Sequence, residues 1–334
     1  MILLLGGTGY VGAAFVKELN HRNWPYVNLS RAQTDYTRFS CLLRILRELN
    51  PQFLINCAGY TGKPNVDACE QHRAETLLGN ASLPATIGHA CQVAGVPWGH
   101  VSSGCIFAGA KILHSNEVRV ERDLTAPGVK ELIEKDPSIV HGFSEGDRPN
   151  FSFRSPPCSF YSGSKALGEE ALEECEQVYV WRLRIPFDEN DGPRNYLSKI
   201  QRYSKVYQNI NSISHLGDYV RACLDLWQRR APFGTYNVTN PGWVDTRQVV
   251  QILQRHLPIH REFEFWQNDD EFYKVAALTP RSNCVMNVQK LLNTGVTMRP
   301  VIEALEDALN RWTPQIPKVG VNLTIEANQV CHPS

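Results

Sequence analysis

A glycine-rich segment near the start of the chain, GGTGYVG at 6–12, constrains the fold more than any other feature. It follows a short apolar run at 2–5 and precedes an amphipathic stretch at 13–22. Glycine lets the backbone turn tightly, approach a ligand closely and pack the next helix against the sheet. A glycine string between a strand and a helix N-terminus therefore predicts a site for the pyrophosphate of a dinucleotide. An ordinary tight turn is the alternative.

The rest of the first half alternates short apolar runs with helix-like stretches. The apolar runs lie at 26–29, 53–56 and 97–103, and the helix-like stretches lie at 39–49 and 72–95. This rhythm predicts parallel strands joined by crossover helices, and right-handed crossovers give a doubly wound order. The predicted fold class is therefore α/β, a doubly wound parallel sheet of the Rossmann type with a smaller C-terminal substrate lobe.

Changes in composition along the chain predict the domain boundaries. We expect a dinucleotide-binding domain over 1–185, interrupted by an insert near 109–157. The insert is charged, contains several prolines and has weak periodicity, so we interpret it as an added lobe or a lid. A substrate lobe is expected over 186–312, in which 234–240 returns to the main sheet. The last segment, 313–334, has no obvious core face and is expected to be a loosely held tail.

Bulk composition argues against several classes of partner. The formal net charge of the 334 residues is zero, which provides no general field for nucleic acid or an anionic membrane surface. The first seven residues are too short to span a bilayer and lack the basic region of a signal peptide. The ten cysteines form no CxxC pair and no metal-like cluster with histidine. We therefore expect no metal, no membrane contact, and mostly buried thiols in a reducing cytoplasm.

The end of the second predicted strand favours one cofactor over another. NLSR at 28–31 lacks the acidic residue that would hold a ribose 2′-hydroxyl. Arg31, helped by Ser30, suits a 2′-phosphate instead, so NADPH is predicted over NADH; a solvated arginine is the alternative. Asp35 is expected at the adenine edge, and 57–59 under the cofactor. The predicted cofactor-binding residues are Gly6, Thr8, Gly9, Tyr10, Val11, Gly12, Ser30, Arg31, Asp35, Cys57, Ala58, Gly59 and Lys165.

A YxxxK pair begins a strongly helical segment in the middle of the chain. Spacing by four places Tyr161 and Lys165 on one helix face. The lysine is expected to lower the pKa of the phenol, so that Tyr161 exchanges a proton with a carbonyl oxygen. Ser103, at the end of the fourth strand, is predicted to polarise the same carbonyl. Cys105, just beyond, is either an acid or base beside that carbonyl or a thiol that fills space under the loop.

Together with longer motifs, these features resemble extended short-chain dehydrogenase/reductases that act on nucleotide sugars, especially the nucleotide-rhamnose synthase epimerase/reductase. The resemblance runs from the glycine loop to residue 312. The motifs that carry it are AGYTGKPNVDACE (58–70), SSGCIF (102–107), FYSGSKALGEE (160–170), LRIPF (183–187), GPRNYLSKIQRYSKV (192–206), GTYNVTNPG (234–242) and TPRSN (279–283). TGKPNVDACE and PRNYLSKI are much more specific than the glycine loop.

The resemblance implies an enzyme that uses NADPH to convert UDP- or dTDP-4-keto-6-deoxyglucose to the β-L-rhamnose nucleotide. It would do so by 3,5-epimerisation followed by 4-keto reduction. In that family a cysteine at the position of Cys105 pairs with a second acid/base, which the match of PRNYLSKI makes Lys199. Related single-function dTDP-4-dehydrorhamnose reductases usually have tyrosine in place of Cys105. An upstream 4,6-dehydratase is implied as the supplier of the keto-sugar.

The same resemblance implies a sugar or diphosphate site. The residues expected to line it are Lys63, Asn65, Asp67, Asn195 and Arg281. Arg281 suits a diphosphate oxygen through bidentate hydrogen bonds, and a structural ion pair is the alternative. Asp218, in ISHLGDYVRA (213–222), is expected to cap or orient rather than to react.

Other functions stay open at this point. One alternative is a monofunctional NADPH-dependent 4-keto-sugar reductase or another nucleotide-sugar epimerase, against which Cys105 and Lys199 argue. A second is a non-catalytic NADP-binding protein similar to methionine adenosyltransferase regulatory subunits, against which the set of Ser103, Tyr161 and Lys165 argues. The insert at 109–157 is longer than in the family, so the accepted sugar and nucleotide are open. Helices that flank such a sheet often pair, which makes a homodimer a further expectation.

Overall fold

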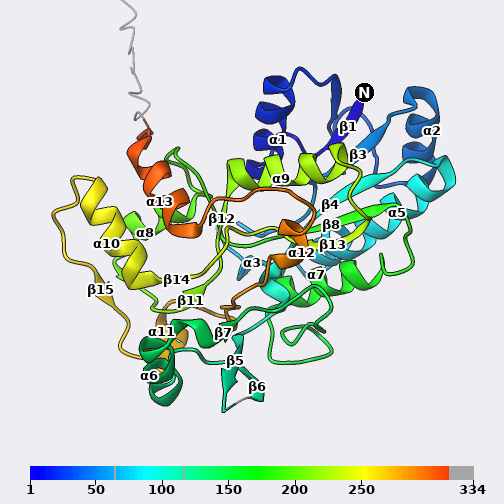
Figure 1. Ribbon diagram of the computed structural model, residues 1–334. Helices are drawn as coiled ribbons and strands as arrows, with labels where there is room; N and C mark the ends of the chain where they lie inside the picture. Colours follow the sequence, from blue (N-terminus) through cyan, green and yellow to red (C-terminus); the bar gives the residue numbers. More distant parts are fainter. Residues whose placement is uncertain (64, 116, 316–334) are drawn as a thin grey trace, which may run out of the picture.

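The computed structural model describes residues 1–63, 65–115 and 117–315. At its centre lies a six-stranded sheet in the order β13-β8-β4-β3-β1-β2 (Figure 1). Its strands are β1 (Ile2–Leu5), β2 (Tyr26–Leu29), β3 (Phe53–Asn56), β4 (Trp98–Ser103), β8 (Val178–Leu183) and β13 (Gly234–Asn237). All neighbouring strands are parallel. The predicted α/β class with a doubly wound parallel sheet is confirmed.

The strand order reverses between β1 and β3, and this reversal positions the candidate site. Ligands of doubly wound sheets bind in the crevice beyond the carboxyl ends of the strands at such a switch point. The glycine loop leaves β1 there, and the segment 57–59 leaves β3 beside it. The predicted strand at 234–240 contributes β13, which pairs with β8 at one edge of the sheet.

Helices cover both faces of the main sheet, because every central strand is apolar on both sides. On one face α1 (Tyr10–His21) and α9 (Leu216–Gln228) pack together around Phe15, Trp181 and Tyr219. On the other face α2 (Phe39–Leu49) and α5 (Leu83–Ala94) share a second core. The remaining helices of this half are α3 (Ala68–Gln71), α4 (Arg73–Leu77) and α7 (Phe160–Glu170).

The helix expected over 72–95 is interrupted by a π-helical turn at Leu78–Ser82, between α4 and α5. The side chain of Asn80 in this turn accepts from the Tyr60 backbone N–H at 2.9 Å and donates to the Tyr60 carbonyl at 2.8 Å. It also donates to the Ser164 hydroxyl at 3.1 Å. The wider turn thus lets one buried amide join the loop after β3 to α7.

A smaller lobe follows β8 and has its own apolar core, in which α8 (Tyr196–Arg202), α10 (Thr246–His256) and α13 (Val301–Asn310) pack together. It also contains α11 (Asp269–Val275), whereas α12 (Gln289–Leu292) packs against β13, with Leu291 in the core of the main sheet. The short strands of the lobe are β9 (Pro186–Phe187), β10 (Lys205–Val206), β11 (Ile210–Asn211), β12 (Ser214–His215), β14 (Val244–Asp245) and β15 (Glu264–Phe265). Thr313 bridges to Asn190, and the rest of the predicted tail, 316–334, lies outside the described residues.

The insert forms a small lobe that contacts the segment 283–285 of the body of the molecule. Its sheet joins β6 (Glu117–Glu121), β5 (Ala110–His114) and β7 (Val140–His141), and α6 (Pro127–Lys135) packs beside them. Gly109 and Phe143 donate backbone hydrogen bonds to the carbonyls of Asn283 and Val285, at 2.6 and 2.9 Å. An apolar cluster joins Ile112 and neighbours of the insert to Val285.

Two negative findings concern the described part of the chain. None of its helices is long and apolar enough to cross a membrane. It also holds no group of three or more metal-ligating side chains.

Candidate active site

The glycine loop forms a cradle of backbone amides at the switch point. Gly6 has φ +78°, and a Cβ on it would lie 2.6 Å from the Ala58 amide nitrogen; a Cβ on Gly12 would collide with the Gly6 carbonyl. Helix α1 begins after Gly9 without a side-chain cap, so its first amides lack intrahelical partners. Thr8 and Gly9 are exposed. This arrangement fits the pyrophosphate of a dinucleotide.

The segment between β2 and α2 carries two exposed arginines, Arg31 and Arg38, of which Arg31 lies nearer the end of the strand. Arg31 is exposed and makes no ion pair or hydrogen bond within the residues that the structure describes. Ser30 donates its hydroxyl to Gln33 Oε1 at 2.9 Å. Asp35 accepts two bonds from Thr37, at 3.2 and 2.5 Å. Arg31 is therefore accessible to an anion, whereas Ser30 and Asp35 are engaged in their own turns.

The segment 57–59 lies against the glycine loop, as the close approach of Gly6 to Ala58 requires. The Ala58 amide donates to Asn56 Oδ1 at 3.0 Å, which fixes the turn after β3. Cys57 is half-buried and Gly59 is exposed. The structure thus brings the two predicted walls of the cofactor site together.

Three predicted reactive side chains meet where β4 ends and α7 begins. Ser103 is the last residue of β4, and its Oγ accepts from the Cys105 amide at 3.2 Å. Tyr161, in the first turn of α7, packs against the apolar cluster that contains Cys105. The Ser103 hydroxyl lies close enough to Tyr161 to act on the pKa of its phenol. Ser103, Cys105 and Tyr161 therefore share one centre.

The pKa of Tyr161 corrects one expectation. Burial, and next the Cys105 thiol, raise the pKa of Tyr161 above its ordinary value, and the Ser103 hydroxyl only partly opposes this. Lys165, one turn further along α7, is buried and donates its Nζ to the Val101 carbonyl at 3.1 Å. The predicted lowering of the phenol pKa by lysine is wrong for this structure, because desolvation is the larger effect.

Glu169, which sequence reasoning missed, lies one further turn along α7 and ties together the elements behind the site. Its carboxylate accepts from the Ser102 hydroxyl at 2.5 Å. It also accepts from Arg182 Nε and Nη2, at 3.0 and 2.8 Å. The signal in the sequence was the spacing of Tyr161, Lys165 and Glu169 by four, which puts all three on one helix face.

Two predicted substrate residues pair with each other. Arg281 donates to both oxygens of Asp67, each at 2.7 Å, and Thr279 donates to the same carboxylate at 2.9 Å. Burial raises the pKa of Asp67, but the bonds and charge of Arg281 outweigh it and leave that pKa below its ordinary value. Of the two interpretations of Arg281, the structure shows the ion pair, which joins the loop after β3 to the segment 279–281.

The other predicted substrate residues lie on this loop and on α8. Lys63 and Asn65 are exposed on the loop, and Asn65 Oδ1 accepts from the Asp67 amide at 2.8 Å. Asn195 is buried and caps α8: its Oδ1 accepts from the Leu197 amide at 3.0 Å. Its Nδ2 donates to backbone carbonyls of 188 and 190, each at 2.8 Å. Both polar atoms of the Asn195 side chain are thus hydrogen-bonded within the protein.

Lys199, the proposed partner of Cys105, is half-buried on α8. Burial, and next the charge of Arg194, lower its pKa from the ordinary value of a lysine. Arg194 donates to the Gly62 carbonyl at 3.0 Å and lies close enough to the Cys69 thiol to lower its pKa. No hydrogen bond or ion pair within the described residues joins the Lys199 side chain to Cys105.

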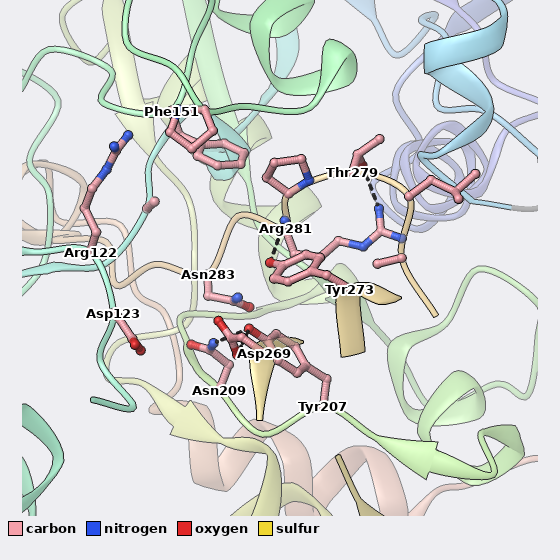
Figure 2. Close-up of a pocket in the computed structure, with 15 residues that line it drawn as sticks. Arg122, Asp123, Phe151, Tyr207, Asn209, Asp269, Tyr273, Thr279, Arg281 and Asn283 are labelled. Atoms are coloured by element: carbon pink, nitrogen blue, oxygen red, sulfur yellow. Dashed lines mark hydrogen bonds between the residues drawn. The ribbon is translucent and has the colours of Figure 1, made fainter. Parts of the chain in front are cut away.

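A cavity of about 480 Å³ opens between the insert and the smaller lobe (Figure 2). Its lining includes Ala108, three residues after Cys105, and Pro157, four residues before Tyr161. In the close-up, Arg122 and Asp123 lie across from Tyr273 and Arg281. The other lining residues are Phe151, Tyr207, Asn209, Asp269, Ala277, Leu278, Thr279, Pro280 and Asn283. They come from distant segments without a shared motif, which is why the sequence predicted only Arg281.

Comparisons with known proteins agree with this geometry. Residues 1–129 match the family model of the RmlD substrate binding domain. A trifunctional UDP-glucose 4,6-dehydratase/UDP-4-keto-6-deoxy-D-glucose 3,5-epimerase/UDP-4-keto-L-rhamnose-reductase of Arabidopsis thaliana is 31% identical over 290 residues. The match covers 86% of this chain and 38% of that protein, so the chain spans about two fifths of the length of this relative.

Two further proteins match along almost their whole length. A bifunctional dTDP-4-dehydrorhamnose 3,5-epimerase/dTDP-4-dehydrorhamnose reductase of Arabidopsis thaliana is 28% identical, over 91% of this chain and 90% of that protein. The crystal structure of the L780 UDP-rhamnose synthase of Acanthamoeba polyphaga mimivirus superposes with a TM-score of 0.77 at 22% identity, over 93% and 98% of the two chains. The resemblance predicted from the sequence is confirmed: the chain is related to the nucleotide-rhamnose epimerase/reductases.

Proposed function

We propose that this chain is an NADPH-dependent enzyme that epimerises C3 and C5 of a nucleotide 4-keto-6-deoxyglucose and then reduces C4, giving the L-rhamnose nucleotide. The observation that carries the proposal is the meeting of Ser103, Cys105 and Tyr161 at the end of β4, one helical turn from Lys165. A reductase needs only the serine, tyrosine and lysine. The buried thiol in the same centre supports the epimerase step.

The residues at the switch point fit NADPH. The uncapped amides at the start of α1 would hold the pyrophosphate, and exposed Arg31 would pair with the 2′-phosphate. Lys165 would hold the nicotinamide ribose from its place behind Tyr161. When bound there, NADPH supplies the hydride that reduces C4. Tyr161 supplies the proton to the C4 oxygen in that step.

Epimerisation needs a proton removed from one face of the carbon and returned to the other. One of Cys105 and Lys199 takes the proton from the carbon next to the ketone, and the C–H electron pair becomes an enolate at the C4 oxygen. The other residue returns a proton to the opposite face. Ser103 and Tyr161 donate hydrogen bonds to that oxygen while it is charged. The same two donors then serve the reduction, so one pocket performs all three changes.

The cavity beside this centre supports a nucleotide-sugar substrate. With the sugar at Cys105 and Tyr161, the nucleotide reaches into the space that begins at Ala108 and Pro157. Lys63 and Asn65 are exposed for sugar or diphosphate contacts, and the Asp67–Arg281 pair holds their loop against the wall of the cavity. Aromatic walls such as Tyr207 suit a base. We propose UDP or dTDP as the nucleotide and a homodimer as the assembly.

The test is to incubate the protein with UDP-4-keto-6-deoxyglucose and its dTDP counterpart in D2O, with and without NADPH. We expect deuterium at C3 and C5 without NADPH, and a rhamnose nucleotide with it, by NMR and mass spectrometry. Cys105→Ala and Lys199→Ala should each slow deuterium entry by about a hundredfold or more. NADPH oxidation without deuterium entry would reduce the proposal to a plain keto-sugar reductase. If the protein shows neither deuterium entry nor NADPH oxidation, the proposed function is wrong.

A further inference from the structure

Two buried arginines stand two residues apart at the end of β8, and only one of them is neutralised. Arg182 is 4% exposed and Arg184 is 6% exposed. Arg182 pairs with the Glu169 carboxylate at 2.8 Å. Arg184 donates instead to two neutral oxygens, Asn211 Oδ1 at 2.6 Å and the Ser282 carbonyl. No carboxylate of the described residues forms an ion pair with Arg184.

This difference is one of charge rather than of hydrogen bonding. One buried nitrogen of each guanidinium, Arg182 Nη1 and Arg184 Nε, lacks a hydrogen-bond partner. A buried cation without a carboxylate is strongly unfavourable for folding, because it loses its hydration without gaining an opposite charge. Such a charge is favourable where an anion forms beside it, and sites of this kind are often functional.

The surroundings of Arg184 contain groups that become anionic. Its side chain packs on Gly104, the residue between Ser103 and Cys105: a Cβ on Gly104 would lie 3.4 Å from Arg184 Cδ. The charge of Arg184 lowers the pKa of the Cys105 thiol and of the Tyr161 phenol, against the larger effect of burial.

Other groups also act on the thiol. Hydrogen bonds with Ser103 and Ser162 lower its pKa, as does the charge of Lys165. The titratable and charged groups around it are Cys69, Cys158, Tyr161, Lys165, Arg184 and Cys284. Among these six, the two cations are Lys165 and Arg184. Lys165 is assigned to the cofactor in the proposed function, which leaves Arg184 as the cation that serves the thiol.

We propose that Arg184 supplies the positive charge that stabilises the Cys105 thiolate, and with it the enolate formed when that thiolate removes a proton from the sugar. In that step the C–H bond breaks, an S–H bond forms, and the electron pair moves to the C4 oxygen. The negative charge thus moves from sulfur to oxygen beside a fixed cation. Arg184 acts through Cys105, and this assignment rests on the proposed function.

The first measurement needs no substrate. Thiolate absorbance in the ultraviolet is titrated in the wild type and in Arg184→Met and Arg184→Lys, each with its Cys105→Ala counterpart subtracted. We expect Arg184→Met to raise the apparent pKa of Cys105 by about one unit or more, and Arg184→Lys to raise it less because the charge remains. An unchanged titration in Arg184→Met, or a wild-type thiol that does not ionise before the protein unfolds, overturns the proposal.

The second measurement separates charge supply from a structural role, with Arg182→Met as the matched variant. Arg182→Met leaves the Glu169 carboxylate buried without its cation, so it should lower the melting temperature markedly. Arg184→Met removes an uncompensated charge and should lower it far less, while slowing deuterium entry into the sugar about tenfold or more. Equal or greater loss of stability in Arg184→Met, including failure to fold, makes the residue structural and overturns the proposal.

The two proposals fail in different ways. If the wild type exchanges no deuterium, the proposed function is wrong, and the thiolate titration still tests the effect of Arg184 on Cys105. If the wild type exchanges deuterium and Arg184→Met exchanges it equally fast, the proposed function stands and the role of Arg184 is wrong.

Discussion

The start of α9 and the edge of the main sheet bury charge in opposite ways. At the start of α9, Asp218 accepts from Arg299 at 3.0 Å and from Asn240 Nδ2 at 2.9 Å, and Arg221 also pairs with it. At the sheet edge, Lys165 and Arg184 are buried with neutral carbonyl or amide oxygens as their acceptors. A buried charge that is paired with an opposite charge supports the fold, whereas a buried cation without a carboxylate is available to a reacting group.

This contrast predicts which property each region controls. Substitutions in the Asp218 cluster should change stability first, and activity only through it. Substitutions at the sheet edge should change activity with little change in stability, since groups arranged for chemistry are commonly not optimal for folding. Variants that reverse this pattern would show that the contrast carries no functional information.

The largest effect is expected for Tyr161→Phe. This change removes the proton donor to the C4 oxygen and leaves the packing of the ring intact, so reduction should slow by about 10²–10⁴-fold. The melting temperature should stay within a few degrees of the wild type. NADPH oxidation with the keto-sugar and a thermal melt are the two measurements. A variant that keeps a tenth of the wild-type rate would remove Tyr161 from the catalytic step.

The opposite outcome is expected for Asp218→Asn. The amide removes the buried carboxylate from Arg299 and Arg221, while Arg299 keeps its ion pair with Asp307, so the free energy of unfolding should fall by about 1–3 kcal/mol. The rate constant of the folded variant at saturating substrate should match that of the wild type. Urea titration followed by fluorescence gives the first value, and kinetics at a temperature where the variant is folded give the second. A stable but inactive variant would place Asp218 in the chemistry.

The same carboxylate gives a pH dependence of known sign. Burial raises the pKa of Asp218, but its bonds with His215 and Arg299 outweigh this and hold the pKa well below its ordinary value. A group with a lowered pKa in the folded state contributes stability above its unfolded pKa and loses it as the pH falls through the folded one. The stability gap between the wild type and Asp218→Asn should therefore be full at neutral pH and shrink on acidification. A gap that grows on acidification would contradict this linkage.

The contrast also shows which parts the sequence could predict. Alternating apolar runs and the glycine string determine the sheet, because burial on both faces and tight turns depend on local residue types. Ser103 and Tyr161 follow strand and helix ends, so their meeting could be predicted. The sequence does not show in the same way that Glu169 has a charged partner and that Arg184 has none. Whether a buried charge has a partner depends on contacts between β8, α7 and the distant segment at 282. A local sequence pattern does not predict such contacts.

The pairing of Asp67 with Arg281 illustrates the same limit. Both residues were predicted to line the substrate site, and Arg281 lies on the wall of the cavity. Each residue is of a type suited to a sugar or a diphosphate, but no local pattern indicates that the two side chains, 214 residues apart, bind each other. Resemblance to a family places a residue in a site, and only the contacts show what occupies its hydrogen-bonding groups.

Glu169→Gln provides an intermediate case, because Glu169 is a paired charge within the reactive edge. Glutamine keeps an acceptor for Ser102 and for one nitrogen of Arg182 but removes the negative charge. We expect a loss of about 1–3 kcal/mol in the free energy of unfolding and a several-fold fall in kcat with KM unchanged. Denaturant titration and steady-state kinetics measure the two. If stability falls while kcat does not, the pair belongs with the Asp218 cluster despite its position.

The smallest effect is expected for Arg31→Ala, which tests a charge outside both clusters. Arg31 is exposed and unpaired within the described residues, so its loss should change the free energy of unfolding by less than about 0.5 kcal/mol. The KM for NADPH should rise about tenfold, because a charge-assisted hydrogen bond to the 2′-phosphate is lost. The KM for NADH should stay the same. Kinetics with both cofactors decide the point. Equal changes for NADPH and NADH would show that Arg31 does not recognise the 2′-phosphate, and unpaired charge alone would then be too weak a sign of function.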